Sequence, residues 1–157
     1  MGYEKHLLVD GANILHAWAE TRALLTRDRD AARARLSLLL GVIHDAEEIR
    51  LTIVFDGRGD ELVVERPDSA LTFSHVYTPS GTTADDVIER LVAKAVDPSA
   101  CVVATDDQAE RSTAEAVGAT WISSSELDAW VRRASARQEQ QLKTRMRENE
   151  RSWKRNE

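Results

Sequence analysis

The segment Leu7-Leu8-Val9-Asp10-Gly11-Ala12-Asn13 is a short apolar run that ends in an Asp-Gly pair, with helical character directly after it. Three later segments also place acids at the end of an apolar run or at the start of a helix: Phe55-Asp56-Gly57, Thr83-Ala84-Asp85-Asp86 and Thr105-Asp106-Asp107. Short buried strands that alternate with helices predict a parallel sheet covered by helices. The carboxyl ends of such strands meet at one edge of the sheet, so we expect these acids to converge there.

Apolar runs and helical periodicity predict the individual elements. Strands are expected over 6–10, 51–55, 71–77, 100–104 and 119–122, with a short extra strand over 62–64. Helices are expected over 12–19, 30–49, 82–96 and 107–117, and again from Glu126, after a cap at Ser123–Ser125. Residues 22–29 are predicted to form a polar connection.

Composition and charge limit the class of protein. The 157 residues suffice for one domain with a substantial core. The single cysteine, Cys101, lies in an apolar run and is expected to be a packed thiol, so no disulfide and no disulfide-linked partner are predicted. Without a signal-peptide pattern or an apolar membrane span, we expect a cytoplasmic protein that makes no membrane contact.

The net charge of −6 is unevenly distributed along the chain. Residues 1–130 hold 12 Lys and Arg against 23 Asp and Glu, a net charge of −11, whereas residues 131–157 hold 9 against 4, a net charge of +5. We therefore predict a domain over residues 1–134 and a charged helical tail over 135–157. A basic tail is typical of nucleic-acid contact, and equally of a solvated helix.

Each acidic segment has a structural and a functional interpretation. Asp10 suits a turn or a helix N-cap, and Thr83 with Asp86 suits a capping box. Asp85 and Glu89, however, lie four residues apart on one helical face, where like charges cost stability unless a cation lies between them. Converging carboxylates favour Mg²⁺ or Mn²⁺ and hence phosphodiester chemistry.

Other catalytic chemistries find little support. The four histidines show no paired spacing and one cysteine cannot build a zinc site. The chain has no phosphate-binding loop and no Gly-x-Ser-x-Gly elbow. A haloacid-dehalogenase-like phosphatase would require an acid two residues after the nucleophile, and Ala12 stands there.

Four motifs together resemble the NYN branch of the PIN-like nucleases, and most closely its bacterial YacP-type members. They are Leu-Leu-Val-Asp10-Gly-Ala-Asn13, Val-Phe-Asp56, Thr-Ala-Asp85-Asp86-Val-Ile-Glu89 and Val-Ala-Thr105-Asp106-Asp107-Gln-Ala-Glu110. The resemblance implies a Rossmann-like three-layer α/β/α sandwich with a central parallel sheet, as in PIN-like proteins.

It further implies a metal-dependent endoribonuclease, linked in the YacP-type members to ribosome-associated mRNA cleavage. By position, Asp10, Asp85 and Asp107 would be the metal-binding carboxylates, with Mg²⁺ or Mn²⁺ as the cofactor. Asn13, Asp56 and Glu89 would complete the catalytic set. The family usually has Ser-Asp where this chain has Asp106-Asp107.

RNA and the ribosome are the implied partners. Because the acidic site repels phosphates, attraction must come from basic residues elsewhere in the chain. The candidates are Arg22, Arg27, Arg29, Arg132, Arg133, Arg137, Lys143, Arg145 and Arg147. The alternative to a nuclease is a non-catalytic RNA- or ribosome-binding module on the same fold.

Overall fold

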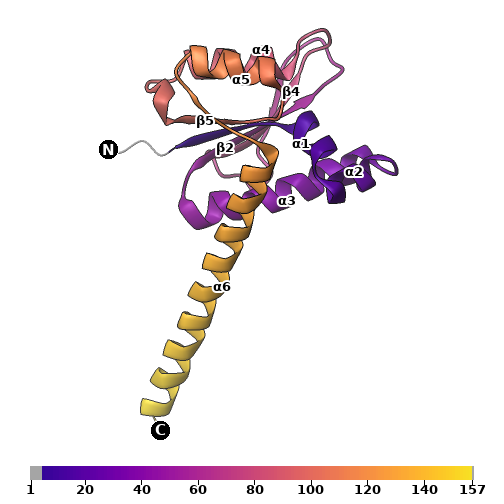
Figure 1. The fold of residues 1–157 in the computed structure, drawn as a ribbon. Coiled ribbons are helices and arrows are strands. Elements are labelled where there is room, and N and C mark those ends of the chain that lie inside the picture. The colour runs from indigo at the N-terminus through magenta and orange to yellow at the C-terminus, as the bar shows by residue number, and fades with distance from the viewer. Residues whose placement is uncertain (1–4, 157) are drawn as a thin grey trace.

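A six-stranded sheet with strand order β3-β4-β2-β1-β5-β6 forms the centre of the computed structural model, which describes residues 5–156 (Figure 1). The strand pairs are parallel except that the edge strand β3 runs antiparallel to β4. The strands are β1 (His6–Asp10), β2 (Arg50–Asp56), β3 (Val63–Glu65), β4 (Phe73–Thr78), β5 (Cys101–Ala104) and β6 (Thr120–Ile122).

Helices cover both faces of this sheet, which confirms the three-layer α/β/α fold class. One apolar cluster joins the sheet to α1, α3 and α6, and a second joins it to α4 and α5 (Figure 1). The helices are α1 (Gly11–Ala17), α2 (Ala19–Leu25), α3 (Arg29–Glu47), α4 (Ala84–Ala93), α5 (Gln108–Ala116) and α6 (Ser124–Arg155), with a 3₁₀ turn at Pro98–Ala100.

Strand β1 shows why the central strands are apolar throughout. Successive side chains point to opposite faces of a sheet, so Leu7 and Val9 enter the cluster beneath α3, and Leu8 enters the cluster beneath α4 and α5. Since helices cover both faces, no position within the strand favours a polar residue. Asp10 is two residues after Leu8, so its side chain points to the same face of the sheet, the face covered by α4 and α5.

Two glycines allow close approach of the backbone at the carboxyl edge. A Cβ on Gly11 would lie 2.5 Å from the Phe55 ring, and a Cβ on Gly57 would lie 2.2 Å from the carbonyl oxygen of Thr78. Any larger residue would push the first turn of α1 or the end of β2 away from its neighbour. The glycine of each Asp-Gly pair therefore allows close packing of the backbone as well as a turn.

Residues 22–29 are partly helical, so the prediction of a polar connection there is wrong. Helix α2 extends to Leu25 because Leu24 and Leu25 pack against the core. Its Thr21 is buried and donates its hydroxyl hydrogen to the carbonyl oxygens of Leu15 and Trp18. Extended backbone at Trp18 separates α2 from α1.

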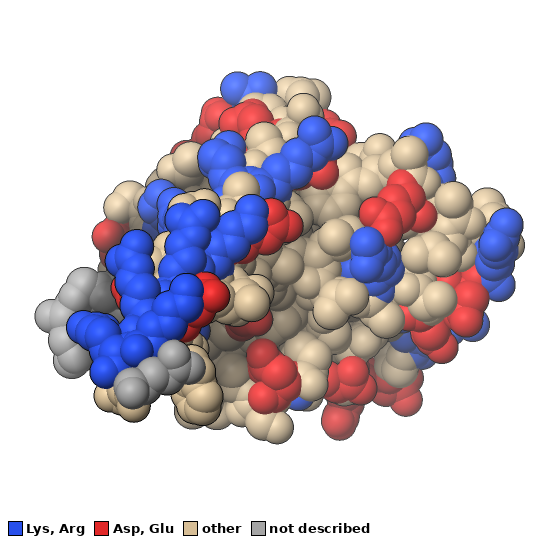
Figure 2. All heavy atoms as spheres, turned by 90° about the horizontal axis from the view of Figure 1, so that it is seen from below, with Lys and Arg blue, Asp and Glu red and all other residues tan. Residues whose placement is uncertain are grey.

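Helix α6 is one continuous 32-residue helix that extends away from the domain (Figure 1). Ser123 and Glu126 form a capping box at its start, and Leu127, Val131 and Ala134 are buried. The predicted boundary between residues 134 and 135 falls inside this helix, where its burial ends. Figure 2 shows Lys and Arg side chains gathered around the projecting part. Across residues 5–156, no helix combines the length and apolar character needed to cross a membrane.

Candidate metal centre

Three carboxylates from three elements meet at the carboxyl edge of the sheet. Asp10 ends β1, Asp85 lies in the first turn of α4, and Glu110 lies in the first turn of α5. One ligand oxygen from each lies within 4.8 Å of the others. The fold therefore brings together two of the acids expected from the sequence and one that was not expected.

Local structure holds each of these acids in place. The Oδ1 atom of Asp10 accepts a hydrogen bond from the Asn13 N–H at 3.3 Å, which caps α1. Thr83 and Asp86 form the capping box that starts α4 next to Asp85. Acids near a helix N-terminus also interact favourably with the helix dipole.

Burial makes the group electrostatically unfavourable when no cation is bound. Asp10 is 7% exposed and Glu110 is 3% exposed. Burial and the neighbouring carboxyl groups of Asp10 and Asp85 raise the pKa of Glu110 to about 10. Burial also raises the pKa of Asp10, with smaller contributions from the charges of Asp85 and Asp56.

The group has the properties of a divalent-cation site. Within the described part of the chain, neither buried carboxylate oxygen of Glu110 has a hydrogen-bond donor. A buried charge without a partner is costly, and a cation bound among the carboxylates would remove that cost. Carboxylate oxygens are the hard ligands that Mg²⁺ and Mn²⁺ prefer. The residues present therefore fit such an ion.

Asp107 lies outside this group and caps helix α5. Its Oδ1 atom accepts hydrogen bonds from the N–H groups of Ala109 at 2.8 Å and Glu110 at 3.1 Å. The side chain is exposed. Asp107 thus holds the backbone that carries Glu110, while the Glu110 carboxylate occupies the centre.

Asp106 connects the centre to helix α6. Its two carboxylate oxygens accept hydrogen bonds from the Ser124 N–H at 2.8 Å and from the Ser124 hydroxyl at 2.6 Å. Its own N–H donates to Oδ1 of Asn13 at 2.8 Å. Asn13 therefore contacts Asp10 through its backbone and the β5–α5 junction through its side chain.

Asp56 and Glu89, the remaining predicted acids, lie outside the three-carboxylate group. Asp56 ends β2 beside β1, where Val54 pairs with Asp10 in register. Glu89 lies one turn after Asp85 on α4 and is exposed.

Glu110 is the member of this group that the sequence did not assign to the site, although it belongs to the fourth motif. Helical spacing is the sequence feature that indicates the burial of Glu110. Glu110 and Ala114 lie four residues apart and are both buried. An acid on the apolar face of a short helix points at the sheet, and this position suggests a functional group.

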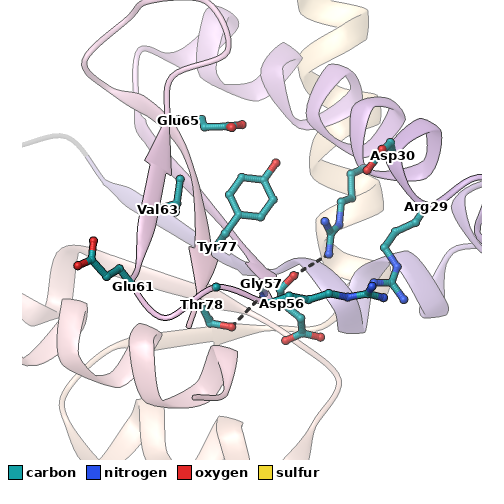
Figure 3. Close-up of a pocket in the computed structure, with 12 residues that line it drawn as sticks. Arg29, Asp30, Asp56, Gly57, Glu61, Val63, Glu65, Tyr77 and Thr78 are labelled. Carbon is teal, nitrogen blue, oxygen red and sulfur yellow. Dashed lines mark hydrogen bonds between the residues drawn. The ribbon is translucent and has the colours of Figure 1, made fainter. Parts of the chain in front are cut away.

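A cavity of about 510 Å³ lies at the same edge, beyond Asp56 (Figure 3). Arg29, one of the predicted RNA-binding residues, lines it together with Arg33, Arg58 and Tyr77. Arg22 and Arg27 are exposed at or just after α2, and Arg22 donates to the carbonyl oxygen of His16.

The other predicted basic residues lie on α6 and are exposed. Arg132 pairs with Asp128 at 2.9 Å. The rest of this set is Arg133, Arg137, Lys143, Arg145 and Arg147.

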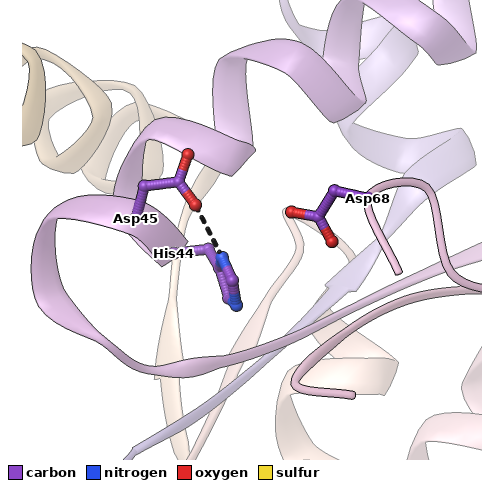
Figure 4. A group of neighbouring side chains, drawn as sticks. All are labelled: His44, Asp45 and Asp68. Atoms are coloured by element: carbon purple, nitrogen blue, oxygen red, sulfur yellow. Dashed lines mark hydrogen bonds and ion pairs between the residues drawn. The ribbon is translucent and has the colours of Figure 1, made fainter. Parts of the chain in front are cut away.

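A second group with ligand atoms close together consists of His44, Asp45 and Asp68 (Figure 4). His44 Nδ1 lies 2.9 Å from Asp45, and its Nε2 lies 2.8 Å from the Thr72 hydroxyl. Both ring nitrogens therefore have partners. Asp45 and Asp68 are exposed, and we assign no site to this group.

The fold and the acidic edge define a NYN-type, nuclease-like α/β protein. A profile of the YacP-like NYN domain matches residues 7–157, and the chain belongs to this family. No curated protein sequence matches the chain significantly.

The solved structures that are similar to this chain include two crystal structures of one protein. Rae1 (YacP) from Bacillus subtilis aligns with a TM-score of 0.74 at 26% identity, covering 97% of this chain and 86% of that chain. A mutant form of the same protein aligns with a TM-score of 0.72 at 26% identity, covering 90% of this chain and 82% of that chain. The resemblance predicted from the motifs is confirmed.

Proposed function

We propose that the protein is a metal-dependent endoribonuclease whose cation is held by Asp10, Asp85 and Glu110. The observation that carries this proposal is the fully buried Glu110 carboxylate, which faces two other acids and has no donor among the described residues. A bound Mg²⁺ or Mn²⁺ would lower the pKa of a water molecule and neutralise charge on the scissile phosphate.

The chain's own residues position this chemistry. The Asn13 N–H orients the carboxylate of Asp10, and Asp107 holds the first turn of α5, from which Glu110 projects. The Thr83 capping box fixes the turn that carries Asp85. Because these contacts form within the folded domain, the three carboxylates are arranged before RNA arrives.

RNA attraction must come from outside the acidic centre, and we propose α6 for this role. Residues 135–156 contain seven Lys and Arg against three Asp and Glu, and nearly all of these residues are exposed. The YacP-type members that the motifs resemble are linked to ribosome-associated mRNA cleavage, and we therefore propose that α6 contacts RNA of the substrate or of the ribosome. Cosedimentation of the chain with ribosomes at rising salt tests this part.

The catalytic proposal is tested by RNA cleavage in Mn²⁺ and in EDTA. Asp10→Asn and Asp85→Asn should abolish metal-dependent cleavage with little change in the melting temperature. Asp86→Asn is the matched control, because Asp86 is the next acid on α4 and serves in the cap. RNA binding without cleavage by the unmodified protein would instead support the non-catalytic module.

A second pair of variants distinguishes the two candidate ligand sets. Asparagine caps helices well, so Asp107→Asn should retain activity, and Glu110→Gln should lose it. The reverse result would assign the cation to Asp107, as the family resemblance implied.

A further inference from the structure

The cavity beyond Asp56 lies between the first turns of α3, the end of β2 and strands β3 and β4 (Figure 3). Phe55, Tyr77 and Val63 form a row across β2, β4 and β3, because Tyr77 is the register partner of both Phe55 and Val63. Residues in register point to the same face, here the face of α3. Arg33 of α3 lies over the Phe55 ring, which is buried, whereas Val63 remains 46% exposed.

The Arg33 guanidinium lies over two aromatic rings at this cavity. The Arg33 guanidinium lies 5.1 Å from the Phe55 ring centroid and 5.5 Å from the Tyr77 ring centroid. One Arg33 nitrogen donates to the carbonyl oxygen of Asp56 at 2.8 Å. Aromatic rings beside guanidinium groups are the surfaces on which proteins stack single-stranded bases.

The charges in the cavity are mixed. Arg29 and Arg58 are exposed, and neither makes an ion pair with any carboxylate of residues 5–156. Asp30, Glu61 and Glu65 line the same space. With Asp56, four acidic residues line the cavity, which disfavours an isolated phosphate ion but suits a ligand that presents an apolar ring, hydrogen-bond donors and one phosphate.

We propose that this cavity binds one nucleotide of single-stranded RNA, with the base against Tyr77 and Val63 and the adjoining phosphate at Arg29 and Arg58. This inference rests on the proposed function, since it assigns a subsite of the RNA substrate. A volume of about 510 Å³ is within the range of small-ligand sites, about 300–1,000 Å³.

The nucleotide held there is a neighbour of the scissile phosphate and does not itself react. Phe55 and Tyr77 face α3, whereas Asp56, by strand alternation, faces the side of α4 and α5, as Asp10 does. An RNA strand would leave the cavity, cross the edge at Asp56 and reach the three carboxylates on the other face. The negative charge of Asp56, which contributes to the raised pKa of Asp10, is consistent with this proximity.

The experiment measures binding and cleavage separately, with the full chain. Binding of a labelled single-stranded oligoribonucleotide is followed by fluorescence anisotropy in EDTA, and cleavage is followed in Mn²⁺. Tyr77→Phe keeps the ring and should bind as the unmodified protein does. Tyr77→Leu keeps an apolar side chain but no aromatic face, and should weaken binding roughly 5- to 150-fold, the range found for loss of base stacking.

Arg58→Ala tests the phosphate contact, with Arg50→Ala as its control at the opposite end of β2. Removing one phosphate contact should make the salt dependence of binding shallower by about 0.7 in log–log slope for Arg58→Ala, and should leave it unchanged for Arg50→Ala. Mononucleotide binding that competes with the oligonucleotide would also support the subsite.

The outcomes separate this inference from the proposed function. Cleavage by the unmodified protein, with equal affinity and cleavage pattern in a folded Tyr77→Leu variant, overturns the subsite and leaves the nuclease proposal intact. Tyr77-dependent binding without any metal-dependent cleavage supports the subsite and overturns the nuclease. A melting temperature for each variant shows whether it is folded. If Tyr77→Leu does not fold, the salt dependence of RNA binding by Arg58→Ala tests the subsite instead.

Discussion

Replacing Glu110 with glutamine should make the metal-free protein more stable. The pKa of Glu110 is raised from an ordinary value of 4.5 to about 10, so at pH 7 the folded protein retains a proton that the unfolded chain releases. Each pH unit above 4.5 costs up to about 1.4 kcal/mol of unfolding free energy, which gives about 3 kcal/mol at pH 7 as an upper figure. Glutamine is neutral at every pH and avoids this cost.

The pH dependence gives the sign of the effect. A group whose pKa is higher in the folded state contributes stability below its unfolded pKa and loses that contribution as the pH rises. The unmodified protein should therefore approach the stability of Glu110→Gln near pH 4.5 and fall behind it steadily towards pH 7. Titrating groups away from the three carboxylates are common to both proteins and cancel in the difference, whereas Asp10 lies beside Glu110 and its own titration contributes to that difference.

Urea unfolding in EDTA at pH 5 and pH 7, followed by tryptophan fluorescence, measures this difference. Glu115→Gln is the control, because Glu115 lies on the same helix, is exposed and pairs with Arg111 at 3.1 Å. Loss of that surface pair should change stability by about 0.5 kcal/mol or less. A Glu110→Gln protein that is less stable than the unmodified one, or a difference in stability that does not grow with pH, would contradict this prediction.

Four further predictions concern other parts of the molecule. Mn²⁺ should raise the melting temperature of the unmodified protein and have a much smaller effect on Asp85→Asn, as differential scanning fluorimetry would show. Burial lowers the pKa of His6 to about 4, so stability should fall as the pH drops from 6.5 towards 4, and His6→Gln should reduce this loss in urea titrations. Asp106→Ala removes two hydrogen bonds to Ser124 and should cost about 1–3 kcal/mol of unfolding free energy in the same assay. Truncation after Gln138 should leave the melting temperature almost unchanged, while weakening RNA binding and flattening its salt dependence, because the removed part of α6 is exposed.

Much of the fold follows from local patterns in the sequence. The apolar runs at 6–10 and 101–104 form strands because helices cover both faces, and helical spacing placed α3 within two residues of its observed bounds. Helix α2 was not predicted because its stability comes from the packing of Leu24 and Leu25 on the core. The polar residues around these two leucines hide the helical pattern in the sequence. Tertiary packing outweighed local propensity there.

The candidate site shows a clearer contrast between what local sequence patterns predict and what tertiary packing determines. Strand ends and helix starts are local features, so the sequence alone predicts that acids gather at the carboxyl edge. Which of these acids meet depends on tertiary packing. Asp106 and Asp107 are adjacent in the chain, yet one contacts Ser124 and the other caps α5, and Glu110 enters the centre because α5 packs that face on the sheet. Spacing along the chain specifies the direction of a side chain relative to its own element, whereas convergence depends on how elements distant in sequence pack together.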